Sequence, residues 1–162
     1  MNEAWVTWEG RVLPEWTDYN GHLRDAFYLL VFSYGSDGFM DSIGLDADGR
    51  EASGHSLFTL ECHLNFLHEV RAGEPVQVQT RLLAHDHKRV WVYHSLHRPG
   101  DEEALAASEQ VLVHVTLEGP KSTPFQTPTL ARLAMLYERR AGLPSPRFTG
   151  RVITAPELPG NG

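Results

Sequence analysis

The sequence has one cysteine, Cys62, among its 162 residues. A single thiol cannot form a disulfide within the chain, so a packed core rather than cross-links must hold the fold together. The N-terminal residues also lack the basic segment followed by an apolar run that is typical of a secretory signal. We therefore expect a cytoplasmic protein.

Long uncharged apolar runs and an excess of positive charge are both missing. The most apolar stretch, residues 26–43, contains Asp37 and Asp41, which argues against a membrane span. The chain has 14 Lys and Arg against 21 Asp and Glu, for a net charge of −7. Because the basic residues are also scattered, nucleic acid is not an expected partner. A local basic cluster still suits a small anionic ligand.

Metal-binding and nucleotide-binding motifs are also lacking. The closest histidine pairs among the nine histidines are His85 with His87 and His94 with His97, and neither pair has cysteines or a clear third ligand nearby. The two glycines in residues 35–38 fall within a predicted helix and suit close packing there. We therefore expect neither a bound metal nor a resident cofactor.

The length and the 41% hydrophobic content fit one domain with a single core. Apolar side chains in residues 26–43 fall on all sides at about 100° per residue, which predicts a helix from about Arg24 to Ile43 that is buried all round. Gly44 stands where a C-cap glycine belongs. The polar, glycine-containing residues 46–54 predict a loop.

Alternation of apolar and polar residues predicts the strands. One precedes the helix at 5–12, and four follow it at 56–66, 76–82, 89–97 and 105–117. In the first of these four, the apolar side chains predicted to face the core are Phe58, Leu60, Cys62, Leu64 and Phe66. The short turns between the strands allow antiparallel hairpins only. The predicted class is α+β, with an antiparallel sheet of about five strands wrapped around one long buried helix.

The C-terminal part follows two prolines, Pro124 and Pro128. Residues 129–140 have the pattern of a short amphipathic helix, and residues 147–162 are rich in proline and glycine, which is typical of an extended arm or a disordered tail. We assign residues 1–127 to the main unit. Residues 128–162 add a helix and a tail to the same domain.

Asp18 is the first candidate for chemistry, because it stands in a turn just before the predicted helix. The free N–H groups and the dipole of a helix N-terminus favour a bound anion or an oxyanion that forms during reaction. A carboxylate beside them can attack a substrate or activate water. Alternatively, Asp18 is only a capping or Asx-turn residue.

Several motifs in this order resemble a known family. They are WTDYNGH at 16–22, NFLHE at 65–69, KR at 88–89 and SEQ at 108–110. Together they resemble the hotdog fold, and within it the 4-hydroxybenzoyl-CoA thioesterase-like branch, over about residues 8–125. More narrowly, residues 19–26 and 54–59 are similar to the thioesterases of carnitine catabolism. Those enzymes hydrolyse betainyl-CoA to glycine betaine and CoA.

The resemblance implies an acyl-CoA thioesterase with no cofactor other than the coenzyme A of its substrate. It makes Asp18 the nucleophile or the general base, and the amides of Leu23, Arg24 and Asp25 the donors to the oxyanion. Glu61 is a second catalytic candidate, although a half-exposed strand residue usually has no chemical role. A non-catalytic acyl-CoA-binding module, or a thioesterase for another short or aromatic acyl group, would share the same motifs.

A trimethylammonium group has no hydrogen-bond donor and is bound by aromatic faces and carboxylates. The candidate substrate-binding residues are Trp16, Tyr19, Asn20, His22, Tyr28, His55 and Ser56. An aromatic-rich core would account for the rings equally well. Candidates for the CoA phosphates are Lys88, Arg89, Lys121 and Ser122, although the first two also fit a solvated charge pair.

A second copy of the chain is the expected partner. The outer face and the edge of a single sheet around one helix need cover, and Leu83, Trp91 and Tyr93 would otherwise expose apolar surface. We therefore expect a homodimer or a dimer of dimers, and the resemblance implies an active site shared between subunits.

Overall fold

The computed structural model describes residues 4–157 and 159–160. Its elements in chain order are β1 (Val6–Arg11), the 3₁₀ helix η1 (Pro14–Trp16), α1 (Asp25–Ser42), α2 (Ala47–Ser53), β2 (His55–Phe66), β3 (Pro75–His85), β4 (Arg89–His97), β5 (Ala106–Thr116), β6 (Lys121–Ser122) and α3 (Thr127–Glu138). The strands form one antiparallel sheet in the order β1-β3-β4-β5-β2, and β6 pairs with β5. This confirms the predicted α+β hotdog class. Within the described ranges, none of the helices combines the length and apolar character needed to cross a membrane.

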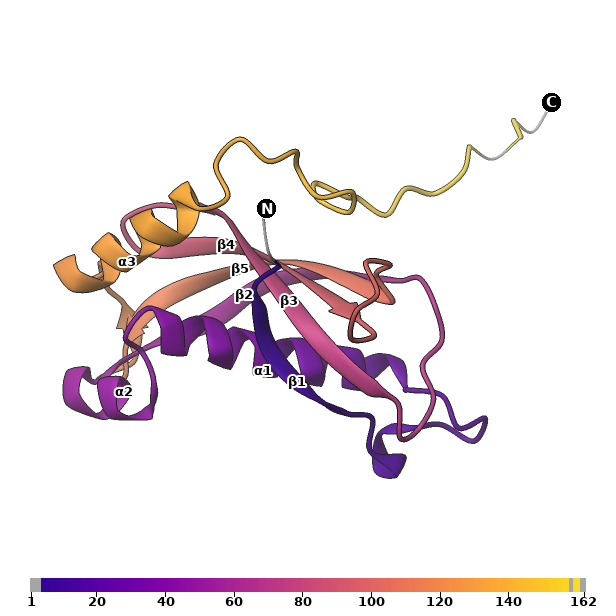
Figure 1. Ribbon diagram of the computed structural model, residues 1–162. Helices are drawn as coiled ribbons and strands as arrows, with labels where there is room; N and C mark the ends of the chain where they lie inside the picture. The colour runs from indigo at the N-terminus through magenta and orange to yellow at the C-terminus, as the bar shows by residue number, and fades with distance from the viewer. Residues whose placement is uncertain (1–3, 158, 161–162) are drawn as a thin grey trace.

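Helix α1 runs along one face of the curved sheet (Figure 1). Two clusters of buried side chains fill the space between them, around Phe32 near the start of α1 and around Phe39 near its end. Gly35 and Gly38 permit the close approach, because a Cβ at Gly38 would clash with the carbonyl oxygen of Thr7 on β1. The expected close packing at these glycines is therefore confirmed.

The prediction that α1 is buried on all sides is wrong for the chain described. One stripe of every fourth residue is exposed, namely Asp25, Leu29, Ser33, Asp37 and Asp41. The helix has a sheet on one side only, so among the described residues this opposite stripe has nothing to pack against. Leu29, which is 40% exposed, is an apolar residue within this stripe, so the sequence pattern did not indicate an exposed side.

The predicted core face of β2 is wrong in part. The register with β5 shifts between Thr59 and Glu61, so Leu60 is an extra residue in a β-bulge. A bulge changes the side of the sheet on which alternate residues lie. Leu57 therefore joins the core in place of Phe58, while Leu64 still packs against it. Phe58 and Leu60 are 44% and 60% exposed on the edge strand of the sheet.

The predicted loop at residues 46–54 is wrong, because Ala47–Ser53 form α2 and the two flanking residues cap it. The carboxylate of Asp46 caps this helix by accepting a 2.8 Å hydrogen bond from the amide of Gly49, and Gly54 ends it in the left-handed conformation. Helix α3 begins at Thr127 rather than residue 129. Its Leu133 is fully buried in the cluster around Phe39, so α3 packs on the same core as α1.

Candidate active site

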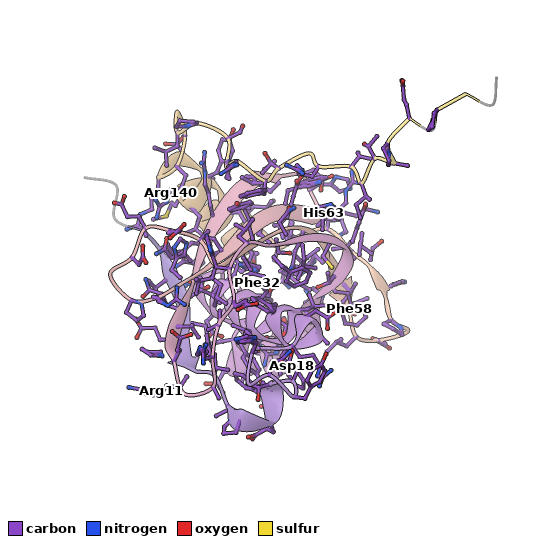
Figure 2. All side chains as sticks on the ribbon, turned by 90° about the vertical axis from the view of Figure 1, so that its right-hand side faces the viewer. Arg11, Asp18, Phe32, Phe58, His63 and Arg140 are labelled. Atoms are coloured by element: carbon purple, nitrogen blue, oxygen red, sulfur yellow. The ribbon has the colours of Figure 1, made fainter. Side chains whose placement is uncertain are left out.

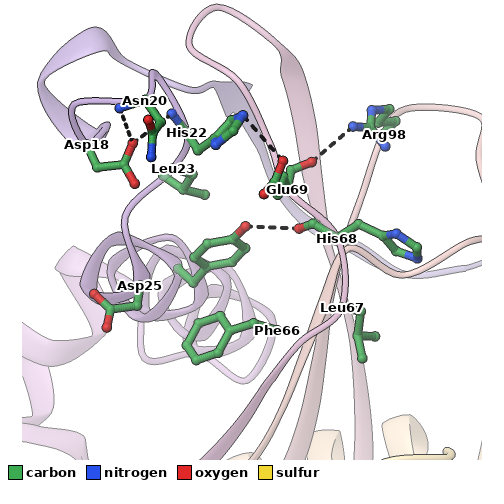
Figure 3. A pocket seen from close by; sticks show the side chains of 11 residues that line it. Asp18, Asn20, His22, Leu23, Asp25, Phe66, Leu67, His68, Glu69 and Arg98 are labelled. Carbon is green, nitrogen blue, oxygen red and sulfur yellow. Dashed lines mark hydrogen bonds and ion pairs between the residues drawn. The ribbon is translucent and has the colours of Figure 1, made fainter.

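A cavity of about 710 Å³ opens at the N-terminal end of α1 (Figure 3). Three separate parts of the chain meet there: the turn and first residues of α1, the end of β2 with the residues after it, and the residue that follows β4. The lining side chains are Asp18, Asn20, His22, Leu23, Asp25, Tyr28, Phe66, Leu67, His68, Glu69 and Arg98.

Asp18 is held in this cavity by an Asx turn. Its Oδ1 atom accepts hydrogen bonds from the amides of Asn20 at 2.8 Å and His22 at 3.2 Å. Gly21 completes the turn with a positive φ of 75°, which a residue with a side chain rarely adopts. The hydrogen bond from the His22 amide, followed by the one from Asn20, lowers the pKa of the Asp18 carboxyl. The turn therefore presents an ionised carboxylate to the cavity.

Two of the three predicted oxyanion donors are wrong. The amide of Leu23 donates to the Val70 carbonyl at 2.7 Å, and that of Arg24 donates to the Trp16 carbonyl at 2.9 Å. In the part of the chain that the structure describes, the Asp25 amide has no such acceptor. It is the first residue of α1, where N–H groups lack intrahelical partners. Asp25 is therefore the donor that remains available to an oxyanion.

The walls of the cavity combine aromatic rings with carboxylates. The rings of Tyr28 and Phe66 meet edge to face, with centroids 5.1 Å apart, and the Tyr28 hydroxyl donates to the His68 carbonyl at 3.1 Å. Burial raises the pKa of Tyr28, which keeps this phenol protonated. The carboxylate of Glu69 is 78% exposed and lies 3.4 Å from Nε2 of His22.

Arg98 is the one guanidinium among the lining side chains. Its Nε atom lies 3.1 Å from the Glu74 carboxylate, and an Nη atom donates to the Glu69 carbonyl at 3.3 Å. Since Glu74 offsets the charge of Arg98, the carboxylates of Asp18, Asp25 and Glu69 give the cavity an acidic character. Such a site favours a cationic group over an anionic one.

The structure brings only part of the predicted substrate-binding set into this cavity. Asn20, His22 and Tyr28 line it, but Trp16 is buried in the core with its ring stacked on Phe27. Tyr19 is 93% exposed and is not among the lining residues. It follows Asp18 at the apex of the turn, where its side chain extends into solvent.

The remaining candidates lie far from Asp18 in the same chain. His55 and Ser56 begin β2 while Phe66 ends it, a separation of about 35 Å along an extended strand. Lys121 pairs with Thr116, which also pairs with His55, so the basic candidates share this distant end. There the Nζ atom of Lys88 lies 3.3 Å from Oγ of Ser122.

Arg89 and Glu61 are also separated from the cavity. Arg89 lies 2.7 Å from Asp86 and over the ring of Trp91, which fits the alternative of a surface charge pair. Glu61 lines a different cavity of about 260 Å³ together with His63 and Trp91. One subunit therefore does not place Glu61 beside Asp18.

Sequence reasoning gave no site role to Phe66, His68, Glu69 or Arg98. Residues 65–69 belong to a motif of the family resemblance, which was the available signal for three of them. Arg98 follows β4 and reaches the cavity only through the pairing of the strands, so no local pattern identifies it.

Residues 12–133 match the family model of the thioesterase-like superfamily. The chain belongs to this superfamily. The match includes the Asp18 turn, α1, the strands β2 to β5 and most of α3, so it covers every segment that lines the cavity. Both the predicted recognition and the predicted enzyme class, a thioester hydrolase, are confirmed.

Within the superfamily, the chain is similar to proteins named for one substrate. It is 60% identical to a betainyl-CoA thioesterase of Pseudomonas aeruginosa over 98% of this chain and 99% of that protein. It is also 39% identical to an L-carnitine dehydrogenase/betainyl-CoA thioesterase of Ruegeria pomeroyi, over 90% of this chain. In that case the chain spans only 30% of the relative's length.

Two solved structures of the superfamily fold agree with this placement. A Pseudomonas putida protein assigned as a thioesterase is 53% identical, with a TM-score of 0.84 over 96% of this chain and 99% of that one. A Staphylococcus aureus protein solved in complex with CoA is 25% identical, with a TM-score of 0.85 over 94% of this chain and 97% of that one.

Proposed function

We propose that this thioesterase hydrolyses betainyl-CoA to glycine betaine and free CoA. The observation that carries the proposal is the ionised Asp18 carboxylate at an acidic, aromatic-walled cavity on the N-terminal end of α1. The 60% identity to a protein of that name over almost the whole chain supports the choice of acyl group.

Asp18 supplies the carboxylate for the first chemical step. As a nucleophile, it adds to the thioester carbonyl and expels the CoA thiolate, leaving an acyl anhydride that water then hydrolyses. As a general base, it takes a proton from the water that attacks the same carbonyl. Both routes place negative charge on the carbonyl oxygen, and the Asp25 amide at the start of α1 is positioned to donate to it.

The acyl group is recognised by the walls of the cavity. The faces of Tyr28 and Phe66 offer the aromatic surface that a trimethylammonium group prefers, each ring contributing about 0.5–2 kcal/mol depending on desolvation. Glu69 supplies negative charge from the same cavity. An uncharged acyl group of equal shape would gain the apolar contacts but not the attraction to these groups.

CoA binding requires a second subunit in this proposal. Strand β2 is an edge strand, so an antiparallel pair of β2 strands would cover its unpaired backbone groups. Pairing two 12-residue strands about their midpoint, near Glu61, places the partner subunit's His55 opposite Phe66. The basic end of one subunit then approaches the Asp18 cavity of the other.

The decisive assay is release of free thiol from a panel of short, aromatic and betainyl CoA thioesters. We expect the wild-type protein to turn over betainyl-CoA and the Asp18→Asn variant to be nearly inactive. If both proteins are equally inert across the panel, the proposal is wrong. Thermal stabilisation by these ligands without turnover would identify a non-catalytic acyl-CoA-binding module instead.

A further inference from the structure

Four side chains form a straight row across the outer face of the sheet, the face turned away from α1. The strand registers pair Arg81 of β3 with Tyr93 of β4, Tyr93 with Glu109 of β5, and Glu109 with His63 of β2. Directly paired residues lie on the same side of a sheet. The row therefore runs from inside the sheet to its β2 edge.

The segment after α3 runs across the side of the sheet that faces away from α1 (Figure 1), and its residues contact this row. The guanidinium of Arg81 donates to the carbonyls of Leu143 at 3.0 Å and Pro144 at 2.6 Å. Although burial raises the pKa of Tyr93 overall, the backbone of Phe148 lies beside its hydroxyl and lowers that pKa. Further along the row, the amide of Gly150 donates to the carboxylate of Glu109 at 2.5 Å.

The segment then reaches the edge strand. Arg151 and Val152 line the cavity of about 260 Å³ that also includes Glu61 and His63 of β2. In Figure 2, His63 lies on the side of this segment, and Asp18 lies beyond Phe32 on the opposite side of the sheet. Because β2 is the last strand of the sheet order, the sheet of residues 4–157 ends there.

Two adjacent apolar side chains stand at this point. Val152 is 80% exposed and Ile153 is 89% exposed, and the described chain continues in an extended path to residue 157. This terminal segment is held over three strands and then exposes Val152 and Ile153 at the sheet edge. Such a segment is suited to pack on the surface of a partner.

We propose that residues 151–157 form an arm that crosses the β2 edge and packs on the outer sheet face of a second copy of this chain. This inference rests on the β2-paired dimer put forward under Proposed function. Seven extended residues span about 23 Å, enough to cross several strands spaced about 4.8 Å apart.

The outer face of the second copy has a matching apolar patch. Phe58 is 44% exposed and pairs with Val113, which lies on the same side of β5 as Glu109. In the same β2 pairing, which sets His55 opposite Phe66, the position opposite His63 is Phe58 of the partner subunit. The row that carries the arm therefore leads to this patch.

Charge holds the start of the arm at the β2 edge, because Arg151 lines the same cavity as Glu61 and Glu109 of its own chain. By two-fold symmetry each subunit contributes one arm and binds the arm of the other, so Val152 and Ile153 of both subunits are covered. The arms thus stabilise the dimer on the outer sheet face, opposite the two active-site cavities.

The first test compares dimer dissociation constants by sedimentation equilibrium. The double variant Val152→Ser/Ile153→Ser keeps the contacts at Arg81, Tyr93 and Glu109, and we expect it to dimerise at least 10-fold more weakly than the wild type. The control Met135→Ser removes a comparably exposed apolar side chain on α3 and should leave the constant unchanged. Equal constants for the wild type and the double variant would overturn the arm but not the β2-paired dimer. A monomeric wild type would contradict both.

A second measurement identifies the surface that the arm contacts. A benzophenone is attached to the thiol introduced by Ile153→Cys in a Cys62→Ser background. This ¹⁴N chain is co-assembled with a ¹⁵N-labelled chain that carries no benzophenone. We expect photo-crosslinks between ¹⁴N and ¹⁵N peptides, the latter containing Phe58 or Val113. Crosslinks found only within the ¹⁴N chain would contradict the arm exchange even if the double serine variant weakens the dimer.

Discussion

Asp18 and His22 are joined by two hydrogen bonds across the turn that precedes α1. The amide of Asp18 donates to the His22 carbonyl at 2.9 Å, and the amide of His22 donates to Oδ1 of Asp18 at 3.2 Å. The turn thus holds the carboxylate through one oxygen and leaves the other oxygen available. Structural and chemical roles of Asp18 therefore coexist rather than exclude each other.

Asp18→Asn separates these two roles. The amide oxygen of asparagine can accept the same backbone hydrogen bonds, so we expect the melting temperature to stay close to that of the wild type. Loss of the carboxylate should lower kcat on betainyl-CoA by about 10²–10⁴-fold. Asp18→Ala should lose both activity and turn stability. A normal kcat in a well-folded Asp18→Asn variant would show that another group acts on the thioester.

The pH dependence of the reaction follows from the same turn. Since the backbone hydrogen bonds lower the pKa of Asp18 below its ordinary value of 3.8, the carboxylate stays ionised down to about pH 4. We expect kcat/KM in buffers of decreasing pH to lose activity only below that value. An acid limb centred near pH 6 would point to a histidine as the essential base.

Glu69→Gln tests the acidic wall of the cavity. The change removes one negative charge but keeps the size of the side chain, so KM for betainyl-CoA should rise several-fold while KM for an uncharged acyl-CoA changes little. Glu102→Gln is the matched control, because Glu102 is exposed and does not line the cavity. Equal effects on both substrates would remove Glu69 from cation recognition.

His94 is expected to make stability depend on pH. It is fully buried between Ser36 at 2.9 Å and Thr80 at 2.8 Å, and burial lowers its pKa to about 3. Between about pH 3 and 6.5 the unfolded chain binds a proton at this residue that the folded chain does not. As the pH falls from about 6.5 to 3, this residue should therefore lower the free energy of unfolding by about 1.4 kcal/mol per pH unit.

Urea unfolding at pH 7, 6 and 5 provides the measurement for His94. We expect His94→Gln to have a lower free energy of unfolding than the wild type at pH 7. Its free energy of unfolding should depend less steeply on pH, by the equivalent of one bound proton. The exposed His87→Gln serves as the control and should keep the wild-type slope. An unchanged slope in His94→Gln would mean that His94 is not neutral in the folded protein.

Much of the fold could be predicted because its signals are local. In β4, Val90, Val92 and Leu96 alternate with polar or half-exposed residues, and all three are buried as the pattern requires. The pattern was misleading in β2, where one extra residue at Leu60 reverses the alternation. Helix α2 was missed because its Asp and Gly residues resemble a loop, although Asp46 is its N-cap.

The site was predictable only where one segment makes it. Asp18, Asn20 and His22 belong to one turn, so a short motif identifies them together. Glu69 and Arg98 reach the same cavity from the ends of different strands, and their meeting depends on a register that the sequence does not show. The amides of Leu23 and Arg24 were misassigned because their acceptors, Val70 and Trp16, lie outside the helix.

The most direct test of the central claim compares kcat/KM for betainyl-CoA with that for 3,3-dimethylbutyryl-CoA, an uncharged isostere of the same acyl group. If the Tyr28 and Phe66 rings and the surrounding carboxylates bind the trimethylammonium group, betainyl-CoA should be preferred at least about 10-fold, or about 1.4 kcal/mol. Equal kcat/KM values for the two thioesters would contradict recognition of the cation, while hydrolysis of both would leave the thioesterase activity itself intact.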